Sequence, residues 1–169
     1  MLKVDLRQLE RRGRLSIDDD VPPDAPLWHD LGLRFTEPLR VRLEAQYAGR
    51  DVLVRGTLEG TAELDCSRCL KALTVPLQEE VAYLFRPGIT ETEADDAEIY
   101  VLPERSDELD LSEVVREQVL LSAPQYAVCE EACRGLCPKC GANLNEEQCR
   151  CEDETGDDRW AALRKLRSE

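Results

Sequence analysis

Eight cysteines constrain this chain more than any other feature of its sequence. Two of them, Cys66 and Cys69, are separated by two residues and stand far from the rest. The others follow within residues 129–151: Cys129, Cys133, Cys137, Cys140, Cys149 and Cys151. Four thiolates around one ion is the usual geometry of a structural zinc site, so eight cysteines divide into two such sites. The sequence therefore predicts two structural Zn²⁺ ions.

A disulfide framework is the alternative use of these cysteines, and it requires an oxidising compartment. The first residues, Met1–Leu6, contain no apolar run of the kind found in a signal peptide. No stretch of the sequence approaches the length of a membrane span. We therefore expect a protein of the reducing cytoplasm, without a membrane partner, whose thiolates bind metal.

The chain of 169 residues carries a formal net charge of −14 at pH 7. This charge excludes a basic surface over the whole fold, because its field would repel nucleic acid at long range. Positive charge is concentrated near the two ends, whereas residues 91–98 are strongly acidic and are interpreted as a solvated loop. The distribution is compatible with a basic protein as partner, or with RNA that is contacted only locally.

Alternating apolar and polar residues predict three long strands, over residues 39–47, 52–65 and 73–85. Their connections are short, so the strands are expected to form an antiparallel meander. Gly56 and Gly60 lie on the apolar face of the second strand and suggest a bend or a bulge. The pattern predicts an α+β domain built on an antiparallel, curled sheet, a meander or partial barrel, with one or two helices.

Weaker patterns surround these strands. Residues 1–12 are interpreted as a short strand, residues 13–38 as a loop that crosses the domain, and residues 99–102 as a fourth, short strand. A helix is predicted after Asp110, which has the spacing of a capping box with Glu113. The chain is thus divided into three parts: a β-sheet domain, 1–125, with a helix over 111–122; a cysteine-rich zinc-binding segment packed on it, 126–155; and a C-terminal helix, 156–169.

Two pairings of the cysteines into metal sites are compatible with the sequence. In the first, the two Cys-x-x-Cys pairs share one ion. The second has two groups of four: Cys66, Cys69, Cys129 and Cys133; and Cys137, Cys140, Cys149 and Cys151. We favour the second, because it uses every cysteine with little tangling of the chain and contains a local loop that metal alone can fold. The tight spacing of Cys149 and Cys151 is less common in a zinc site, and the first pairing stays open.

Catalysis is less well supported than a structural role. A Cys-x-x-Cys pair also serves in thiol exchange, but Cys66 and Cys69 lie in a predicted hairpin rather than at the start of a helix. A catalytic zinc keeps one position open and usually needs histidine or a nearby acid, and the only histidine, His29, lies in a proline-flanked loop. We expect no enzyme activity and no small-molecule substrate. The alternative is a zinc-dependent enzyme or a thiol oxidoreductase acting on RNA or protein.

The order of these motifs resembles one known family. Cys66-Ser-Arg-Cys69-Leu70 lies between two strands; a helix with an acidic start follows, then the cysteine-rich sequence Cys129–Cys151, then Asp158-Arg159-Trp160-Ala161. This arrangement is similar to the bacterial YceD family, the large ribosomal RNA subunit accumulation proteins, which are also found in plastids. The stretch from Cys133 to Asn145 is the most specific part. The chain departs from the family at Asp157-Asp158-Arg159, where a proline is expected between acid and arginine.

The resemblance implies a cytoplasmic, non-enzymatic factor in ribosome biogenesis that large-subunit ribosomal RNA needs in order to accumulate or be processed. The family's gene often stands beside that of a small zinc-binding ribosomal protein, which suggests an assembly partner. The expected partner is therefore a basic large-subunit ribosomal protein, precursor large-subunit ribosomal RNA, or both. Direct RNA contacts are expected from four cations within or beside the cysteine pairs: Arg68, Arg134, Lys139 and Arg150. The alternative is that these cations only offset the charge of the thiolates.

Overall fold

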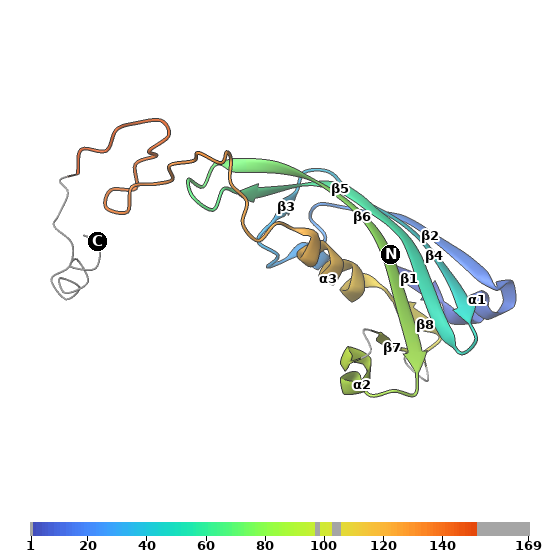
Figure 1. Ribbon diagram of the computed structural model, residues 1–169. Helices are drawn as coiled ribbons and strands as arrows, with labels where there is room; N and C mark the ends of the chain where they lie inside the picture. The colour runs from blue at the N-terminus through green and yellow to red at the C-terminus, as the bar shows by residue number, and fades with distance from the viewer. Residues whose placement is uncertain (1, 97–98, 103–105, 152–169) are drawn as a thin grey trace.

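The computed structural model describes residues 2–96, 99–102 and 106–151 (Figure 1). Its main feature is a long, curved sheet with one helix along the concave face, and the cysteine-rich segment extends from one end of this sheet (Figure 1). The fold is α+β, as the sequence predicts. Among the described strands, the sheet does not close into a barrel. Its strands follow the order β2 (Arg14–Val21), β4 (Leu39–Ala48), β5 (Asp51–Asp65), β6 (Ala72–Pro87) and β7 (Tyr100–Leu102).

Three antiparallel strands form the centre of the sheet: β4 (Leu39–Ala48), β5 (Asp51–Asp65) and β6 (Ala72–Pro87). The three predicted long strands are thereby confirmed. The apolar residues of the alternating pattern face one side of the sheet, where Val52, Val54 and Leu58 are fully buried. The alternation therefore produces one apolar face, on which the core of the domain is built.

The opposite, convex face of the sheet carries side chains of both charges. Arg42 pairs with Asp18 at 2.7 Å and with Asp20 at 3.3 Å, and Arg14 pairs with Glu44 at 3.3 Å. Positive and negative side chains thus face each other across neighbouring strands, which favours this strand pairing.

Two glycines on the apolar face of β5 allow neighbouring groups to approach closely. A Cβ atom at Gly56 would lie 1.9 Å from the backbone oxygen of Arg42, and one at Gly60 would lie 2.8 Å from Cδ1 of Leu39. The register of β5 against β6 nevertheless runs through both positions without interruption. There is thus no bulge in this pairing, and the curvature in Figure 1 is a bend of continuous strands.

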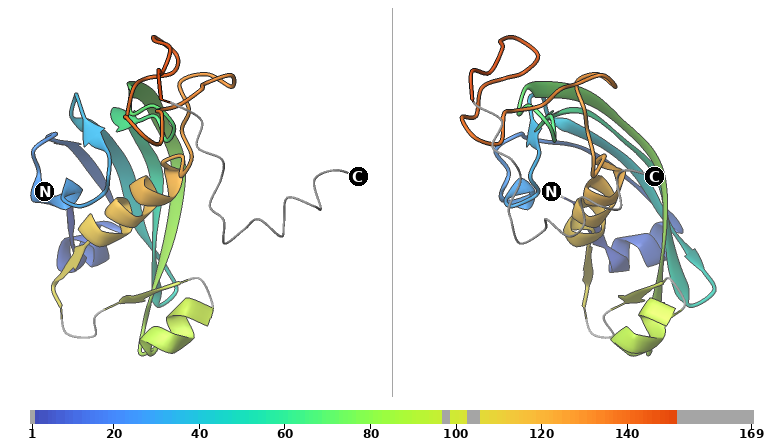
Figure 2. Two further views of the ribbon diagram at one scale, coloured as in Figure 1. Left: turned by 90° about the vertical axis from the view of Figure 1, so that its left-hand side faces the viewer. Right: turned by 60° about the vertical axis from the view of Figure 1, so that its left-hand side comes forward.

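The helix α3 (Ser112–Ser122) lies along the concave face (Figure 2). Its buried stripe is the predicted one, with Leu111, Val115 and Val119 fully buried. At its start, the carboxylate of Asp110 accepts a hydrogen bond from the backbone N–H of Ser112 at 2.9 Å. The predicted helix is confirmed, and it covers the core from the side opposite the sheet together with a short 3-10 helix, η1 (Pro26–Trp28).

The first prediction for the N-terminal residues is wrong. Residues 1–12 contain the short strand β1 (Lys3–Asp5) followed by the helix α1 (Leu6–Arg12), rather than a strand alone. The carboxylate of Asp5 accepts a hydrogen bond from the N–H of Gln8 at 2.8 Å, and Gly13 ends the helix in the left-handed conformation. These two caps favour a helix, and the local alternation of apolar residues does not reveal them.

The second N-terminal prediction is also wrong, because the supposed crossing loop begins with a strand. β2 (Arg14–Val21) pairs with β4 in antiparallel register. Ile17 and Val21 point into the core, whereas Asp18 and Asp20 point outward. β2 is the outermost strand on this side of the described sheet, and charged residues are common on such edge strands because they prevent pairing with other chains.

Two corrections apply to the region after β6. The acidic run, predicted as a loop, begins with the short helix α2 (Glu91–Asp96), where Thr90 donates its backbone N–H to a carboxylate oxygen of Glu93 at 2.9 Å. The predicted strand at 99–102 is present as β7 (Tyr100–Leu102), but it pairs with β6 in parallel, so the sheet is mixed. Two further short strands complete the fold: β3 (Arg34–Phe35), which pairs with β5, and β8 (Glu108–Asp110), which pairs with β1.

After α3, the described residues 123–151 form turns and extended segments, with one isolated β-bridge between Leu136 and Asn143. The predicted helix at 156–169 lies outside the described residues, and the proposed three-part division of the chain stays a prediction. No helix in the described part of the chain has the length and apolar character that a bilayer span requires.

Candidate functional site

The eight cysteines come together as two groups of four. The first tetrad is Cys66, Cys69, Cys129 and Cys133, and the second tetrad is Cys137, Cys140, Cys149 and Cys151. Within each tetrad all four sulfur atoms lie within 4.8 Å of one another. This is the second of the two pairings considered from the sequence. The two Cys-x-x-Cys pairs do not share a site.

The separations between sulfur atoms fit coordination of one ion by each tetrad. In the first tetrad they are 3.9 Å for Cys66–Cys133 and 3.6 Å for Cys69–Cys129. In the second tetrad they are 3.3 Å for Cys137–Cys149 and 3.5 Å for Cys140–Cys149. A disulfide would require about 2.0 Å. A tetrahedral ion with Zn–S bonds of about 2.3 Å would place its sulfur ligands about 3.8 Å apart. Four thiolates also form the donor set that tetrahedral zinc or an iron–sulfur centre prefers, so these residues fit a metal ion.

The two Cys-x-x-Cys turns have the same backbone hydrogen bonds. The N–H of Leu70 donates to the carbonyl of Cys66 at 2.9 Å, and the N–H of Gly141 donates to the carbonyl of Cys137 at 2.9 Å. In each turn the N–H of the first cysteine then donates to the carbonyl five residues later, at 2.8 Å. Leu70 and Gly141 both have positive φ, 60° and 75°. Two segments of different sequence therefore form one type of metal-binding turn.

Backbone N–H groups converge on the first sulfur of each turn. Burial opposes ionisation of Cys66, but its sulfur accepts hydrogen bonds from the N–H groups of Arg68 at 3.5 Å and Cys129 at 3.4 Å. Despite the burial, these bonds and one from Cys69 lower the pKa of Cys66 to about 6. The thiolate is the form that binds metal, so this turn is prepared for an ion.

The second turn behaves in the same way. The N–H groups of Cys140 and Lys139 lower the pKa of Cys137 to about 6. The last thiols to ionise show the opposite effect: the neighbouring thiol of Cys133 raises the pKa of Cys129 to about 12, and that of Cys149 raises the pKa of Cys151 to about 12. Four thiolates at this spacing repel one another, so full ionisation of a tetrad requires a cation at its centre.

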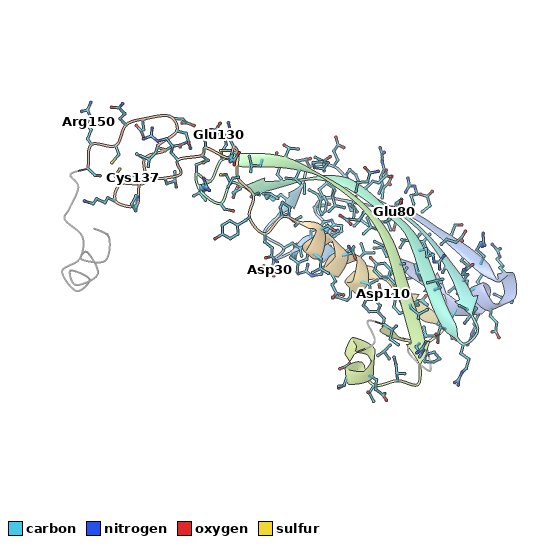
Figure 3. All side chains as sticks on the ribbon, in the orientation of Figure 1. Asp30, Glu80, Asp110, Glu130, Cys137 and Arg150 are labelled. Carbon is cyan, nitrogen blue, oxygen red and sulfur yellow. The ribbon has the colours of Figure 1, made fainter. Side chains whose placement is uncertain are left out.

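The surroundings of the two tetrads differ. Cys66 and Cys69 sit at the tip of the β5–β6 hairpin, against the segment that follows α3, and the N–H of Ser67 donates to the carbonyl of Ala127 at 2.8 Å. The first tetrad is mostly buried, whereas Cys140 of the second is exposed. Figure 3 shows Cys137 and Arg150 at the far end of the molecule, away from the sheet. The first tetrad therefore ties the sheet to the cysteine-rich segment, and the second organises the end of that segment.

Asn145 connects the two tetrads. It lies in the loop between Cys140 and Cys149, yet its Nδ2 donates to the sulfur of Cys133 in the first tetrad at 3.5 Å. Its Oδ1 accepts the N–H of Arg134 at 2.7 Å, and Oδ1 of Asn143 accepts its Nδ2 at 2.8 Å. Hydrogen bonds to ligating atoms orient them and tune a bound metal, so Asn145 is a candidate for this role that sequence reasoning missed. The Asn-x-Asn pattern at 143–145 is the signal that could have indicated it.

The four cations expected to contact RNA lie beside the tetrads, and one has a structural role. Nη1 of Arg68 donates to the carbonyls of Glu131 at 3.2 Å and Cys133 at 3.0 Å, which fastens the hairpin tip to the opposite segment. Arg134, Lys139 and Arg150 are exposed on the cysteine-rich segment. Contact of these side chains with RNA stays a prediction.

Fold and site together define a class of protein: an α+β domain whose sheet carries, at one end, two four-cysteine sites that could hold metal. Residues 54–167 match the family "Large ribosomal RNA subunit accumulation protein YceD", which is more than half of the chain. The chain therefore belongs to the YceD family, as its motifs suggested.

Individual relatives agree with this assignment. A chloroplast protein of Arabidopsis thaliana, a YCED homolog named for large ribosomal RNA subunit accumulation, is 40% identical over 67 residues, which is 40% of this chain and 21% of that protein. This chain thus matches about a fifth of that relative's length. The protein YlbN of Bacillus subtilis is 30% identical over 138 residues, 79% of this chain and 77% of YlbN. An uncharacterized Mycobacterium tuberculosis protein is 28% identical over 165 residues, 96% of this chain and 79% of that protein. No solved structure matches.

Proposed function

We propose that this protein is a non-enzymatic factor in large ribosomal subunit biogenesis, needed for large-subunit ribosomal RNA to accumulate. Membership of the YceD family, which is named for this accumulation, is the observation that carries the proposal. The factor would act in the cytoplasm by binding a basic ribosomal protein or precursor RNA. The net charge of −14 favours a basic protein as the direct partner.

The two tetrads support a structural rather than a catalytic metal in this proposal. Each tetrad supplies four sulfur ligands to one point, and a structural zinc is bound by four protein ligands, whereas a catalytic zinc keeps a position for water. The residues that would hold the two Zn²⁺ ions are all eight cysteines. A bound ion would fix the hairpin tip against the segment after α3 and would close the loop that contains Asn145.

Depletion of the protein in its native host tests the role in RNA accumulation. We expect the ratio of large-subunit to small-subunit ribosomal RNA to fall, and expression of the wild-type chain to restore it. A Cys66→Ser/Cys69→Ser variant should not restore it, whereas Ser67→Ala, in the same turn, should. An unchanged RNA ratio after depletion would overturn the proposed function.

Metal and thiol analysis of the native protein tests the structural role. Two zinc ions per chain and no reactive thiol are expected. One labile pair of thiols would instead support the thiol oxidoreductase alternative. A pull-down with and without ribonuclease then separates the two partners, because binding to a basic protein should survive ribonuclease and weaken with salt.

A further inference from the structure

Exposed apolar side chains gather where the sheet meets the cysteine-rich segment. In the described part of the chain, six large apolar side chains are exposed. Tyr47 stands apart on β4. The other five form what we call the neck surface: Leu70 (64% exposed), Leu120 (50%), Leu121 (70%), Tyr126 (86%) and Val128 (36%). Exposed apolar side chains that lie close together mark an interaction site more often than scattered ones do.

A hydrogen bond and a close sulfur contact bring the parts of the neck surface to one junction. Four of its residues lie within nine consecutive positions at the end of α3 and just after it, 120–128. Leu70 belongs to the first cysteine turn, which is held against this segment by the bond from the N–H of Ser67 to Ala127. The sulfurs of Cys69 and Cys129 lie 3.6 Å apart across the same junction. The exposed side chains therefore come from two segments that touch.

The junction is also hollowed. A surface cavity of about 220 Å³ is lined by Leu31, Leu33, Leu64, Leu120 and Pro124, among others. Leu120 thus belongs to both the cavity and the neck surface. Sites for small molecules are usually larger, roughly 300–1,000 Å³. A cavity of this size on an apolar surface suits one inserted side chain of a protein partner.

The apolar face that α3 presents to the core does not account for these leucines. Leu111, Val115 and Val119 already form its fully buried stripe. In a helix of 3.6 residues per turn, Leu120 and Leu121 fall outside that stripe. Exposure of two adjacent leucines has no role in the packing of the domain, which is consistent with a binding role.

The charges around the neck surface indicate the chemistry of the partner. Four exposed acids belong to the segments that form or border it: Asp30, Glu117, Glu130 and Glu131. Figure 3 shows Asp30 near α3 and Glu130 near the tip of the hairpin. Four cations of the same segments offset these acids: Arg68, Lys71, Arg116 and Arg134. Arg68 and Arg116 are held by backbone carbonyls but keep their charge, and Arg34, beside the cavity, is paired with Asp65 at 3.2 Å. A first tetrad loaded with Zn²⁺ would add a charge of about −2.

We propose that the neck surface binds a basic protein segment, rich in Lys and Arg, which inserts an apolar side chain at Leu120 and places its cations against the surrounding acids. RNA is disfavoured here, because acids and cations offset each other and the metal-loaded first tetrad makes the net charge negative. The identification of this segment with a ribosomal protein rests on the proposed function. The evidence that the neck surface is a binding site is the exposure of its side chains, the cavity and the nearby charges.

Site-specific photo-crosslinking tests the proposal. A photo-crosslinking amino acid is placed at Leu121 or Tyr126 in the full, metal-loaded chain, and at Tyr47 as the control. The probe is the nuclease-treated fraction of host proteins retained by a cation exchanger, with proteins extracted from purified large subunits as a second probe. We expect identified Lys/Arg-rich proteins to crosslink at least about 10-fold more from the neck positions than from Tyr47, because binding energy is concentrated at the centre of an interface.

Charge reversal is the second test of the proposal. Glu130→Lys/Glu131→Lys should reduce the crosslink about 10-fold, whereas Glu80→Lys/Glu91→Lys, which changes the charge equally elsewhere, should leave it within about twofold. Equal crosslinking from Tyr47, equal loss with both reversals, or crosslinks to RNA in untreated extract would each overturn the proposal. Crosslinks to a basic protein that is not ribosomal would support the neck surface as a binding site but would contradict the proposed function. The RNA ratio after depletion tests that function separately.

Discussion

The sheet domain and the cysteine-rich segment are held in shape by different forces. In the sheet domain, Leu39, Val54 and Leu58 belong to one continuous apolar core that the strands and α3 share. Around the first tetrad, the buried cluster consists of Cys66, Cys69 and Cys133, with Leu73, Cys129 and Leu136 packed against it. A core of that size excludes too little apolar area from water to fold a segment alone. We therefore expect the segment to gain its stability from metal coordination, which the sheet should not need.

Removal of the metal is expected to have the largest effect and to separate the two regions. Chelation under reducing conditions should abolish protection from hydrogen exchange over residues 129–151, while β4 and β5 remain protected. Structural zinc contributes about 10–16 kcal/mol in small zinc-binding peptides, far more than the remaining contacts of this segment. Hydrogen exchange followed by mass spectrometry measures both regions at once. Equal loss in β4 would show that the sheet also depends on metal.

A core substitution should produce the opposite pattern. Leu58→Ala is expected to lower the free energy of unfolding by about 2–5 kcal/mol, because Leu58 is fully buried at the centre of β5. Urea denaturation of the metal-loaded protein measures this change, and metal content should stay the same. Gln78→Ala, on the exposed face of β6, is the control and should change stability by less than about 0.5 kcal/mol. Loss of metal in the Leu58 variant would show that the metal sites depend on the stability of the sheet.

Asn145→Ala should weaken the connection between the two tetrads. Removing a hydrogen bond to a metal ligand typically reduces metal affinity about 10–100-fold, and here the bond reaches Cys133 from the loop of the second tetrad. Competition with a chromophoric chelator can resolve the two binding steps. The first tetrad should lose affinity, and Gln148→Ala, an exposed neighbour, should have no effect. If the affinity of the second tetrad alone falls, Asn145 supports its own loop and does not couple the sites.

The sequence predicts the sheet and the tetrads better than it predicts the edges of the fold. β4, β5 and β6 show clear alternation because one face of each is buried. The second tetrad is favoured by spacing, since its short loop closes locally, and the first tetrad takes the four remaining cysteines. β2 was missed because Asp18 and Asp20 resemble a loop, although they are the outward residues of an edge strand. The parallel pairing of β7 depends on a contact distant in sequence, which no local pattern encodes.

The tetrad surroundings were predicted least well, and for a similar reason. The hydrogen bonds of Asn145 and Arg68 join residues 12 and 65 positions away, at Cys133 in both cases. Spacing within the cysteine motifs reveals which residues share an ion. It does not reveal which neighbouring side chains orient the ligands, because those depend on how two loops lie against each other.

The smallest expected effect concerns Leu70, where the two cysteine turns differ. Leu70 has φ of 60° at the position that Gly141 occupies in the second turn. The left-handed conformation costs a residue with a side chain about 1–2 kcal/mol, and glycine at this position would remove that cost. The greater freedom of glycine in the unfolded state offsets about 0.5–1 kcal/mol of the stability gained. Leu70→Gly should therefore stabilise the first turn by about 0.5–1 kcal/mol, measured by urea denaturation of the metal-loaded protein, while Gly141→Leu should destabilise the second. The side chain of Leu70 is 64% exposed, so its loss removes little packing.

If the neck surface binds a partner, the same Leu70→Gly change should weaken that binding while it stabilises the turn. A variant that loses both stability and binding would instead show that Leu70 packs within its own chain.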